Sequence, residues 1–130
     1  MKSKGTYISM YLNQRKKLKV ELLTSEHDKE IGYMFKDSIT DSEGKLFVYK
    51  NKGSKSFWMK NVNFPLDIVS LDNYGKILDI QTLPAYNKNS SRIPSHRTPS
   101  GTYSVLEVLG NTMYKNKVFP GNVLVVDKFI

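Results

Sequence analysis

Apolar residues along this chain occur either in strict alternation with polar ones or in short unbroken runs, and both patterns predict β-strands. Residues 17–22 alternate between charged and apolar side chains, as in a strand with one face buried and the other in water. Residues 46–49 are apolar at every position, as in a central strand covered on both faces. Further strands are predicted at residues 56–59, 66–71, 76–82, 103–109 and 123–126.

Turn and capping residues separate these strands. The sequence Asp72-Asn73-Tyr74-Gly75 lies between two predicted strands and indicates a hairpin. Ser25 can cap a helix and form a capping box with Asp28. The residues that follow fall on one helical face: His27, Ile31, Met34 and Phe35. Gly110-Asn111-Thr112 can cap a second, short helix.

These elements predict an α+β fold that is mainly β. We expect about seven or eight short strands with one or two short helices, arranged as a small barrel-like sheet or as two packed sheets. A chain of 130 residues fits one domain, which we assign to residues 17–130. Residues 1–16 are then an N-terminal extension that adds an edge strand. Residues 83–101 carry three prolines and form the one long irregular stretch, and loops of this length are usually functional or mobile.

Composition limits the chemistry. The chain has no cysteine, which excludes disulfides, thiolate nucleophiles and most zinc sites. The net charge is +8, and residues 1–20 and 44–66 contain basic residues without any acid. Such a field attracts anions, nucleic acid included, although a basic surface most often serves solubility. Neither a membrane-spanning run nor the apolar core of a secretory signal is present, so we expect a cytoplasmic protein.

The segment Ser56-Phe57-Trp58-Met59-Lys60-Asn61 is the most distinctive part of the sequence. If it is a strand, Trp58 and Lys60 share one face while Phe57 and Met59 share the other, so only one pair can line a pocket. In the functional interpretation the ligand-binding residues are Trp58, Lys60, Asn61, Asp67, Arg92 and Arg97. In the structural interpretation, Phe57 and Met59 pack the core, Lys60 and Asp67 form an ion pair, and Asn61 holds a turn.

No catalytic motif emerges from the remaining residues. Asp67, Asp79 and Glu107 are candidates for paired carboxylates, but nothing in their spacing selects a pair. His27 is expected to be a packed or capping residue, and His96 an exposed residue of the long loop. Two distant histidines form no metal motif, and no glycine-rich phosphate loop is present. We therefore expect no metal and no cofactor, and favour a protein that is not an enzyme.

The order and spacing of several segments resemble the family called domain of unknown function 192. Most distinctive is Trp58-Met59-Lys60-Asn61 followed by Pro65-Leu66-Asp67. The resemblance covers roughly residues 17–127 through these further segments: 32–36, 44–49, 72–77, 105–108, Gly110 and 120–123. It implies a compact β-rich α+β domain and no established activity. Many members have an N-terminal signal or anchor, so export by analogy stays open.

Three residues depart from the pattern of that family. Lys36 stands where arginine is usual, Lys45 where methionine is usual, and Asn122 where a Gly-Asp pair is usual. The leading hypothesis for function is a non-catalytic binding module that holds a small polar or anionic molecule, such as a sugar-like ligand, near Trp58. The alternatives are nucleic-acid binding through the basic surface, a small hydrolase that uses Asp67 with Lys60, and an accessory protein that binds another protein.

Overall fold

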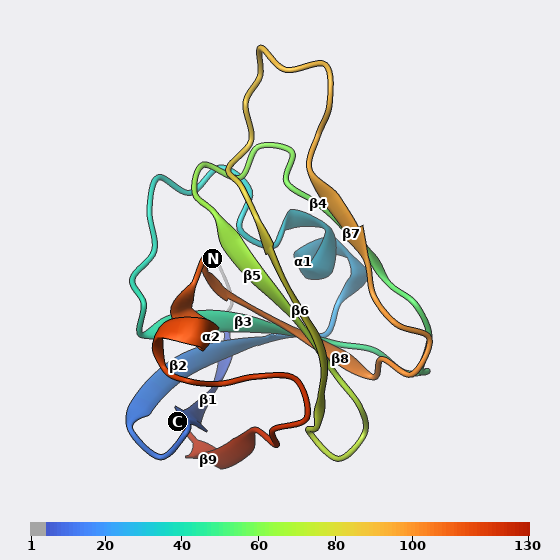
Figure 1. The fold of residues 1–130 in the computed structure, drawn as a ribbon. Coiled ribbons are helices and arrows are strands. Elements are labelled where there is room, and N and C mark those ends of the chain that lie inside the picture. The colour runs from blue at the N-terminus through green and yellow to red at the C-terminus, as the bar shows by residue number, and fades with distance from the viewer. Residues whose placement is uncertain (1–4) are drawn as a thin grey trace.

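A computed structural model describes residues 5–130 and shows nine strands with two short helices (Figure 1). The strands are β1 (Thr6–Leu12), β2 (Lys16–Leu23), β3 (Glu43–Val48), β4 (Ser56–Trp58), β5 (Leu66–Leu71), β6 (Ile77–Leu83), β7 (Ser95–Arg97), β8 (Ser104–Leu109) and β9 (Val125–Phe129). The helices are α1 (Glu26–Ile31) and α2 (Thr112–Lys115). The prediction of a mainly β fold is therefore confirmed.

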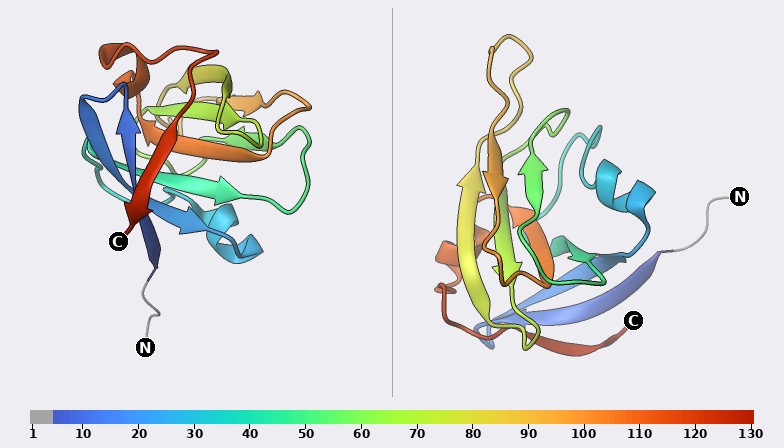
Figure 2. Two further views of the ribbon diagram at one scale, coloured as in Figure 1. Left: turned by 90° about the horizontal axis from the view of Figure 1, so that it is seen from below. Right: turned by 90° about the vertical axis from the view of Figure 1, so that its right-hand side faces the viewer.

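Seven strands form one curved sheet in the order β6-β5-β8-β3-β2-β1-β9, and β4 and β7 form a small second sheet (Figure 2). The pair β2–β3 is parallel and the other ladders are antiparallel. The large sheet does not close into a barrel. The strand count exceeds the prediction because β7 arises from the stretch predicted to be irregular. The N-terminal extension forms β1, which lies between β2 and β9, one strand in from the edge.

The core has two parts, one on each face of the central strands. In β5, Val69 and Leu71 join one cluster of buried side chains, whereas Leu66 and Ile68 join the other. All six residues of β5 are buried. This burial on both faces explains why the sequences of central strands are unbroken apolar runs, since neither face contacts water. The second cluster also includes Phe47 and Met59, so it packs beneath the small sheet.

The turn and capping residues recognised in the sequence predicted most turns correctly. Ser25 caps α1 and accepts a hydrogen bond from the Asp28 N–H, as predicted. The helix ends at Ile31, earlier than the apolar pattern suggested, because Gly32 leaves helical geometry with φ +49°. In the β5–β6 hairpin, the Asp72 side chain accepts hydrogen bonds from two backbone N–H groups of the turn, and Gly75 has φ +83°. The last strand begins at Val125, later than predicted.

Two further features of the fold bear on function. Residues 84–94 join β6 to β7 and project from one end of the molecule as a long loop (Figure 2). Among the described residues, no helix is long and apolar enough to cross a membrane.

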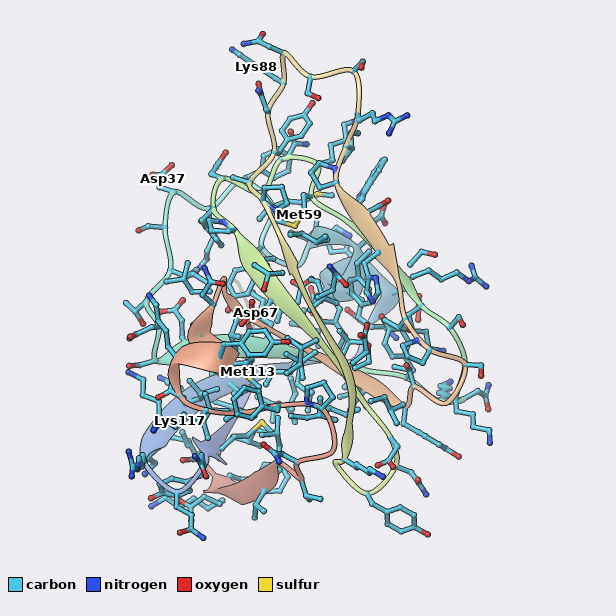
Figure 3. The ribbon with its side chains drawn as sticks, in the orientation of Figure 1. Asp37, Met59, Asp67, Lys88, Met113 and Lys117 are labelled. Carbon is cyan, nitrogen blue, oxygen red and sulfur yellow. The ribbon has the colours of Figure 1, made fainter. Side chains whose placement is uncertain are left out.

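Asp67 anchors α2 to the sheet. Its side chain lies in β5 with no exposed surface and accepts three hydrogen bonds. The donors are the Thr82 hydroxyl at 2.6 Å, the Asn111 N–H at 2.9 Å and the Met113 N–H at 3.0 Å. Figure 3 shows Asp67 and Met113 close together at this junction. The carboxylate thus satisfies N–H groups at the start of α2 that lack a partner within so short a helix.

Replacing Asp67 with asparagine should destabilise the fold strongly. An amide NH₂ would face the N–H donor of Asn111 or of Met113, so one buried donor would lose its acceptor. We expect the Asp67→Asn variant to lose about 2–4 kcal/mol of unfolding free energy in urea titrations. The matched control is Asp72→Asn, which alters an exposed turn and should cost less than about 1 kcal/mol. Equal losses in the two variants would contradict the anchoring role of Asp67.

Candidate functional site

A cavity of about 210 Å³ lies between the end of α1, the strands β3 and β8, and the small sheet. We call it the Glu107 cavity, after the one residue of β8 that lines it. Five aromatic side chains contribute to its wall: Tyr33, Phe47, Tyr49, Phe57 and Trp58. Two more ionisable side chains, those of Lys29 and Glu30, lie along its lining. The cavity therefore combines an apolar aromatic wall with one buried carboxyl group.

Glu107 is only 5% exposed, and no side-chain hydrogen bond or ion pair involves its carboxyl group within residues 5–130. The fully enclosed polar side-chain atoms without a partner in that range are the hydroxyls of Ser9 and Ser70, so the Glu107 oxygens keep contact with the cavity. Glu107 lies opposite Lys45 of β3 and Ile68 of β5 in the ladder. Burial raises the pKa of Glu107 from 4.5 to about 8, while the positive charge of Lys45 partly opposes the rise. At neutral pH the Glu107 carboxyl group is thus protonated in most molecules. In that form it can both donate and accept a hydrogen bond.

The charged groups near Glu107 are largely paired with one another. The Lys45 ammonium lies 2.8 Å from Glu21 and 5.1 Å from the Tyr33 ring centroid. Burial, followed by the charges of Glu43 and Glu107, raises the pKa of the Tyr33 hydroxyl far above its usual value. Burial and then Glu107 also raise the pKa of Tyr49. Both phenols therefore stay protonated and serve as neutral walls at physiological pH.

Close packing shapes the floor of the cavity. The rings of Phe47 and Phe57 meet edge to face, with centroids 5.2 Å apart. Gly32 permits this approach: a Cβ there would lie 3.2 Å from the Phe47 ring and 3.7 Å from the Glu107 carboxyl oxygen. Its φ of +49° is also one that side chains other than glycine rarely adopt. A glycine is thus required where the chain leaves α1 and passes over Glu107.

Lysines surround the mouth of the cavity. Lys29 and Lys55 place their ammonium groups 4.3 and 4.5 Å from the Tyr49 ring centroid. Lys60 lies 5.4 Å from the ring centroid of Trp58, which is 52% exposed. Lys29 is already bonded to the Val48 carbonyl and to Glu26, so it is held in place. Lys55 and Lys60 thus add positive charge beside the aromatic wall of the cavity.

The structure separates the residues that sequence reasoning grouped as ligand-binding. Trp58 lines the Glu107 cavity, and Lys60 lies over its ring. Asn61 has φ +62° and lines a different surface depression. Arg97 sits in β7 opposite Ser56, and Arg92 is exposed on the long loop. Trp58 and Lys60 alone remain near one cavity.

One prediction about this segment was wrong. Asp67 does not pair with Lys60, because its oxygens accept from Thr82, Asn111 and Met113 instead. Phe57 packs against the second core cluster as expected, and it also lines the cavity together with Trp58. The strand is only three residues long, so strict alternation does not govern its end. Met59 is buried in the core as expected.

The histidines also differ from expectation. His96 is part of β7, and its ring nitrogen lies 2.7 Å from the Asp79 carboxylate of β6, with its side chain 19% exposed. It is not an exposed loop residue, because β7 pairs with β4 beside β6. His27 is exposed on α1 and Ser25 provides the cap, so the predicted packed or capping role was wrong. No cluster of three potential metal ligands occurs within residues 5–130.

Glu107 is the residue that sequence reasoning failed to select. A signal was present: it is the one acid within the apolar run Val105-Leu106-Glu107-Val108-Leu109. In a strand covered on both faces, such an acid cannot reach water. The hydrophobic pattern of the sequence could not show whether the Glu107 side chain would face a basic residue or an empty cavity.

Removing the ionisable group at 107 should stabilise the protein and flatten its pH dependence. The folded state keeps this proton up to about pH 8, whereas an unfolded glutamate loses it near 4.5, so stability falls as pH rises between these values. At about 1.4 kcal/mol per pKa unit, Glu107→Gln should gain about 3 kcal/mol at pH 7. Urea unfolding across this pH window measures the effect.

The control for this experiment is Glu30→Gln, an exposed residue of the same cavity, which should leave the pH profile unchanged. A Glu107→Gln variant that is less stable than the native protein at pH 7 would show that Lys45 keeps Glu107 ionised, contrary to our assignment.

Two solved structures share this fold over nearly the whole chain. A protein from Sinorhizobium meliloti 1021, described as a "putative transcription regulator", has a TM-score of 0.79 and 24% identity, covering 97% of this chain and 96% of that chain. A protein of unknown function from Novosphingobium aromaticivorans DSM 12444 has a TM-score of 0.77 and 22% identity, covering 92% of this chain and 83% of that chain. At these identities the similarity shows the fold alone.

No curated protein matches the sequence significantly. The sequence profile of domain of unknown function 192, described as an uncharacterised ACR, matches residues 9–126. The resemblance carried by the Trp-Met-Lys-Asn and Pro-Leu-Asp segments is thereby confirmed. Because the match extends over most of the chain, this protein belongs to the domain of unknown function 192 family.

Proposed function

We propose that this protein is a non-catalytic binding module that holds one small polar molecule in the Glu107 cavity. The observation that carries the proposal is a carboxyl group that is only 5% exposed, opens onto an aromatic-lined cavity and makes no hydrogen bond to another side chain among the described residues. A ligand that fills the cavity displaces solvent from this carboxyl group, so binding requires a polar atom that bonds to it in place of that solvent. A group of this kind with a shifted pKa is a common mark of a binding site.

The lining indicates the chemistry of the ligand. The protonated Glu107 can donate to a carbonyl or hydroxyl oxygen and accept from a hydroxyl or N–H group. The rings of Phe57 and Trp58 can pack against an apolar ring face. The lysines at the mouth favour a ligand whose outer end is negative or richly hydroxylated. A sugar-like ring or a small hydroxy acid meets all three conditions.

The size of the cavity limits the ligand to a single small unit. Its 210 Å³ equals the liquid volume of roughly seven water molecules. This is below the roughly 300–1,000 Å³ of drug-sized sites, so an oligomer would extend beyond the mouth.

We propose binding and not catalysis because the cavity lining lacks a paired nucleophile and base. Ser56 is part of the lining, but a serine needs a neighbouring base, and no histidine is among the residues that line this cavity. The acid–base pair predicted from the sequence is also separated, since Asp67 serves as a buried anchor for α2.

Trp58 offers a direct test because it is the one tryptophan of the chain and half-exposed at the cavity. Small sugars, polyols and hydroxy acids can be titrated while tryptophan emission and thermal stability are followed. We expect a ligand to shift both. Affinity should be highest below pH 8 and fall above it, because the protonated Glu107 is the binding form.

Three variants separate the contributions of Glu107. Glu107→Leu should weaken affinity about tenfold, the worth of one buried hydrogen bond. Glu107→Gln should retain most of the affinity and lose its pH dependence. Asp127→Asn, on the distant β9, should behave as the native protein. If none of these compounds binds, or if affinity rises above pH 8, the proposed role of Glu107 is refuted.

Nucleic-acid binding is the second candidate, supported by the net charge of +8 and by the description of the Sinorhizobium meliloti relative. Phosphate contacts predict a steep loss of affinity with rising salt. Single-stranded and duplex oligonucleotides in the same titrations test this directly. Binding that is insensitive to salt, or absent, would exclude it.

A further inference from the structure

Phe35 is held in a conformation that its residue type disfavours. Its φ is +66°, in the left-handed region that a bulky side chain rarely adopts. Its ring is nevertheless 69% exposed, so burial of the side chain offsets little of the backbone strain. A strained backbone and an exposed phenyl ring both oppose folding. Features that folding does not favour are frequently part of a binding site.

Hydrogen bonds hold the backbone that carries this ring. The Phe35 N–H donates to the Asn61 carbonyl at 2.9 Å, and Asn61 itself has φ +62°. The Asn63 side-chain amide donates to the Lys36 carbonyl at 2.7 Å. The loop that carries Phe35 is thus tied on two sides to the segment after β4. The backbone that carries the ring is thus held by hydrogen bonds at Phe35 and at Lys36.

The long loop between β6 and β7 completes the surface. The Tyr86 N–H donates to the Val62 carbonyl at 2.9 Å, which brings the start of that loop against the same segment. The Asn87 side chain accepts from the Asn89 N–H at 3.0 Å and orders the next residues. In Figure 3, Lys88 lies at the projecting tip of this loop, and Asp37 lies on the loop that follows Phe35.

Together these elements enclose a shallow depression of about 530 Å³, which we call the Phe35 platform. Its lining consists of two aromatic residues, Phe35 and Tyr86, four asparagines and Lys88. It contains no acid and shares no lining residue with the Glu107 cavity. The two share one short segment, since Val62 lines the cavity while Asn61 and Asn63 line the platform.

We propose that the Phe35 platform is a second binding site and that it takes a neutral oligosaccharide. A sugar ring has an apolar C–H face, which packs on an exposed aromatic ring. Its hydroxyl groups both donate and accept hydrogen bonds, and an asparagine amide offers both roles in one side chain. A lining that carries one positive charge and no acid gives little reason to prefer a highly charged ligand. The open shape suits a chain of sugar units that extends past its edges.

This proposal does not depend on the Glu107 cavity and predicts a different set of affected residues. Titration of the isotope-labelled protein with neutral oligosaccharides of glucose, galactose and N-acetylglucosamine should shift the backbone resonances of Phe35, Asn61 and Tyr86. The resonances of Glu107 and Phe47 should stay in place. No shift at the platform with any of these sugars would overturn the proposal, as would a preference for peptides over sugars.

Phe35→Gly is the decisive variant because glycine accepts the left-handed backbone. It should leave the urea midpoint unchanged or raised, since strain is relieved and little buried area is lost. Oligosaccharide affinity should fall tenfold or more, the worth of about one aromatic contact. Phe35→Trp keeps an aromatic ring and should retain affinity. Tyr74→Ser removes an exposed aromatic residue from the β5–β6 turn and should change neither property. Unchanged affinity in Phe35→Gly would refute the role of the ring.

Discussion

The three hydrogen bonds to the buried Asp67 carboxylate are the constraint on which the rest of the structure depends. They join β5 to β6 through Thr82 and fix the start of α2 through the N–H groups of Asn111 and Met113. The chain then turns below the sheet and reaches β9, which pairs with β1. A buried carboxylate is tolerated only where donors replace its hydration, and here that requirement binds two other segments, β6 and the start of α2, to one side chain.

A second buried acid, Glu107, lies in the neighbouring strand β8, but its surroundings differ from those of Asp67. In the β5–β8 ladder, Asp67 is opposite Val108, and Glu107 is opposite Ile68. Because successive side chains in a strand alternate between faces, the two carboxyl groups point to opposite sides of the sheet. Asp67 meets backbone donors, whereas Glu107 meets aromatic rings and an open cavity. Two acids of similar chemistry thus have different surroundings, one as an anchor for α2 and the other in the wall of a cavity.

The segment after β4 contributes to the lining of two different cavities. Trp58 and Val62 face the Glu107 cavity, while Asn61 and Asn63 face the Phe35 platform. The Trp-Met-Lys-Asn motif of the family therefore lies where the walls of both surfaces meet. Its buried member, Met59, joins the core and receives its backbone position from a hydrogen bond to the Pro94 carbonyl. This arrangement links the motif to the long loop without requiring that its side chains form one site.

The sequence by itself determined all the strands except β7, the principal turns and the family. Alternation in β2 and the unbroken apolar runs of β3 and β5 follow from burial on one face or two, and the Asp72 turn depends on neighbouring residues alone. Tertiary structure decided which acid is an anchor and which lines a cavity. It also decided that His96 is part of a strand and that the Phe35 ring is exposed. These outcomes depend on partners more than ten residues away in the chain, such as Asn111 for Asp67 and Asn61 for Phe35. A pattern along the chain does not contain such distant contacts, because burial and hydrogen bonding are settled only when the strands assemble.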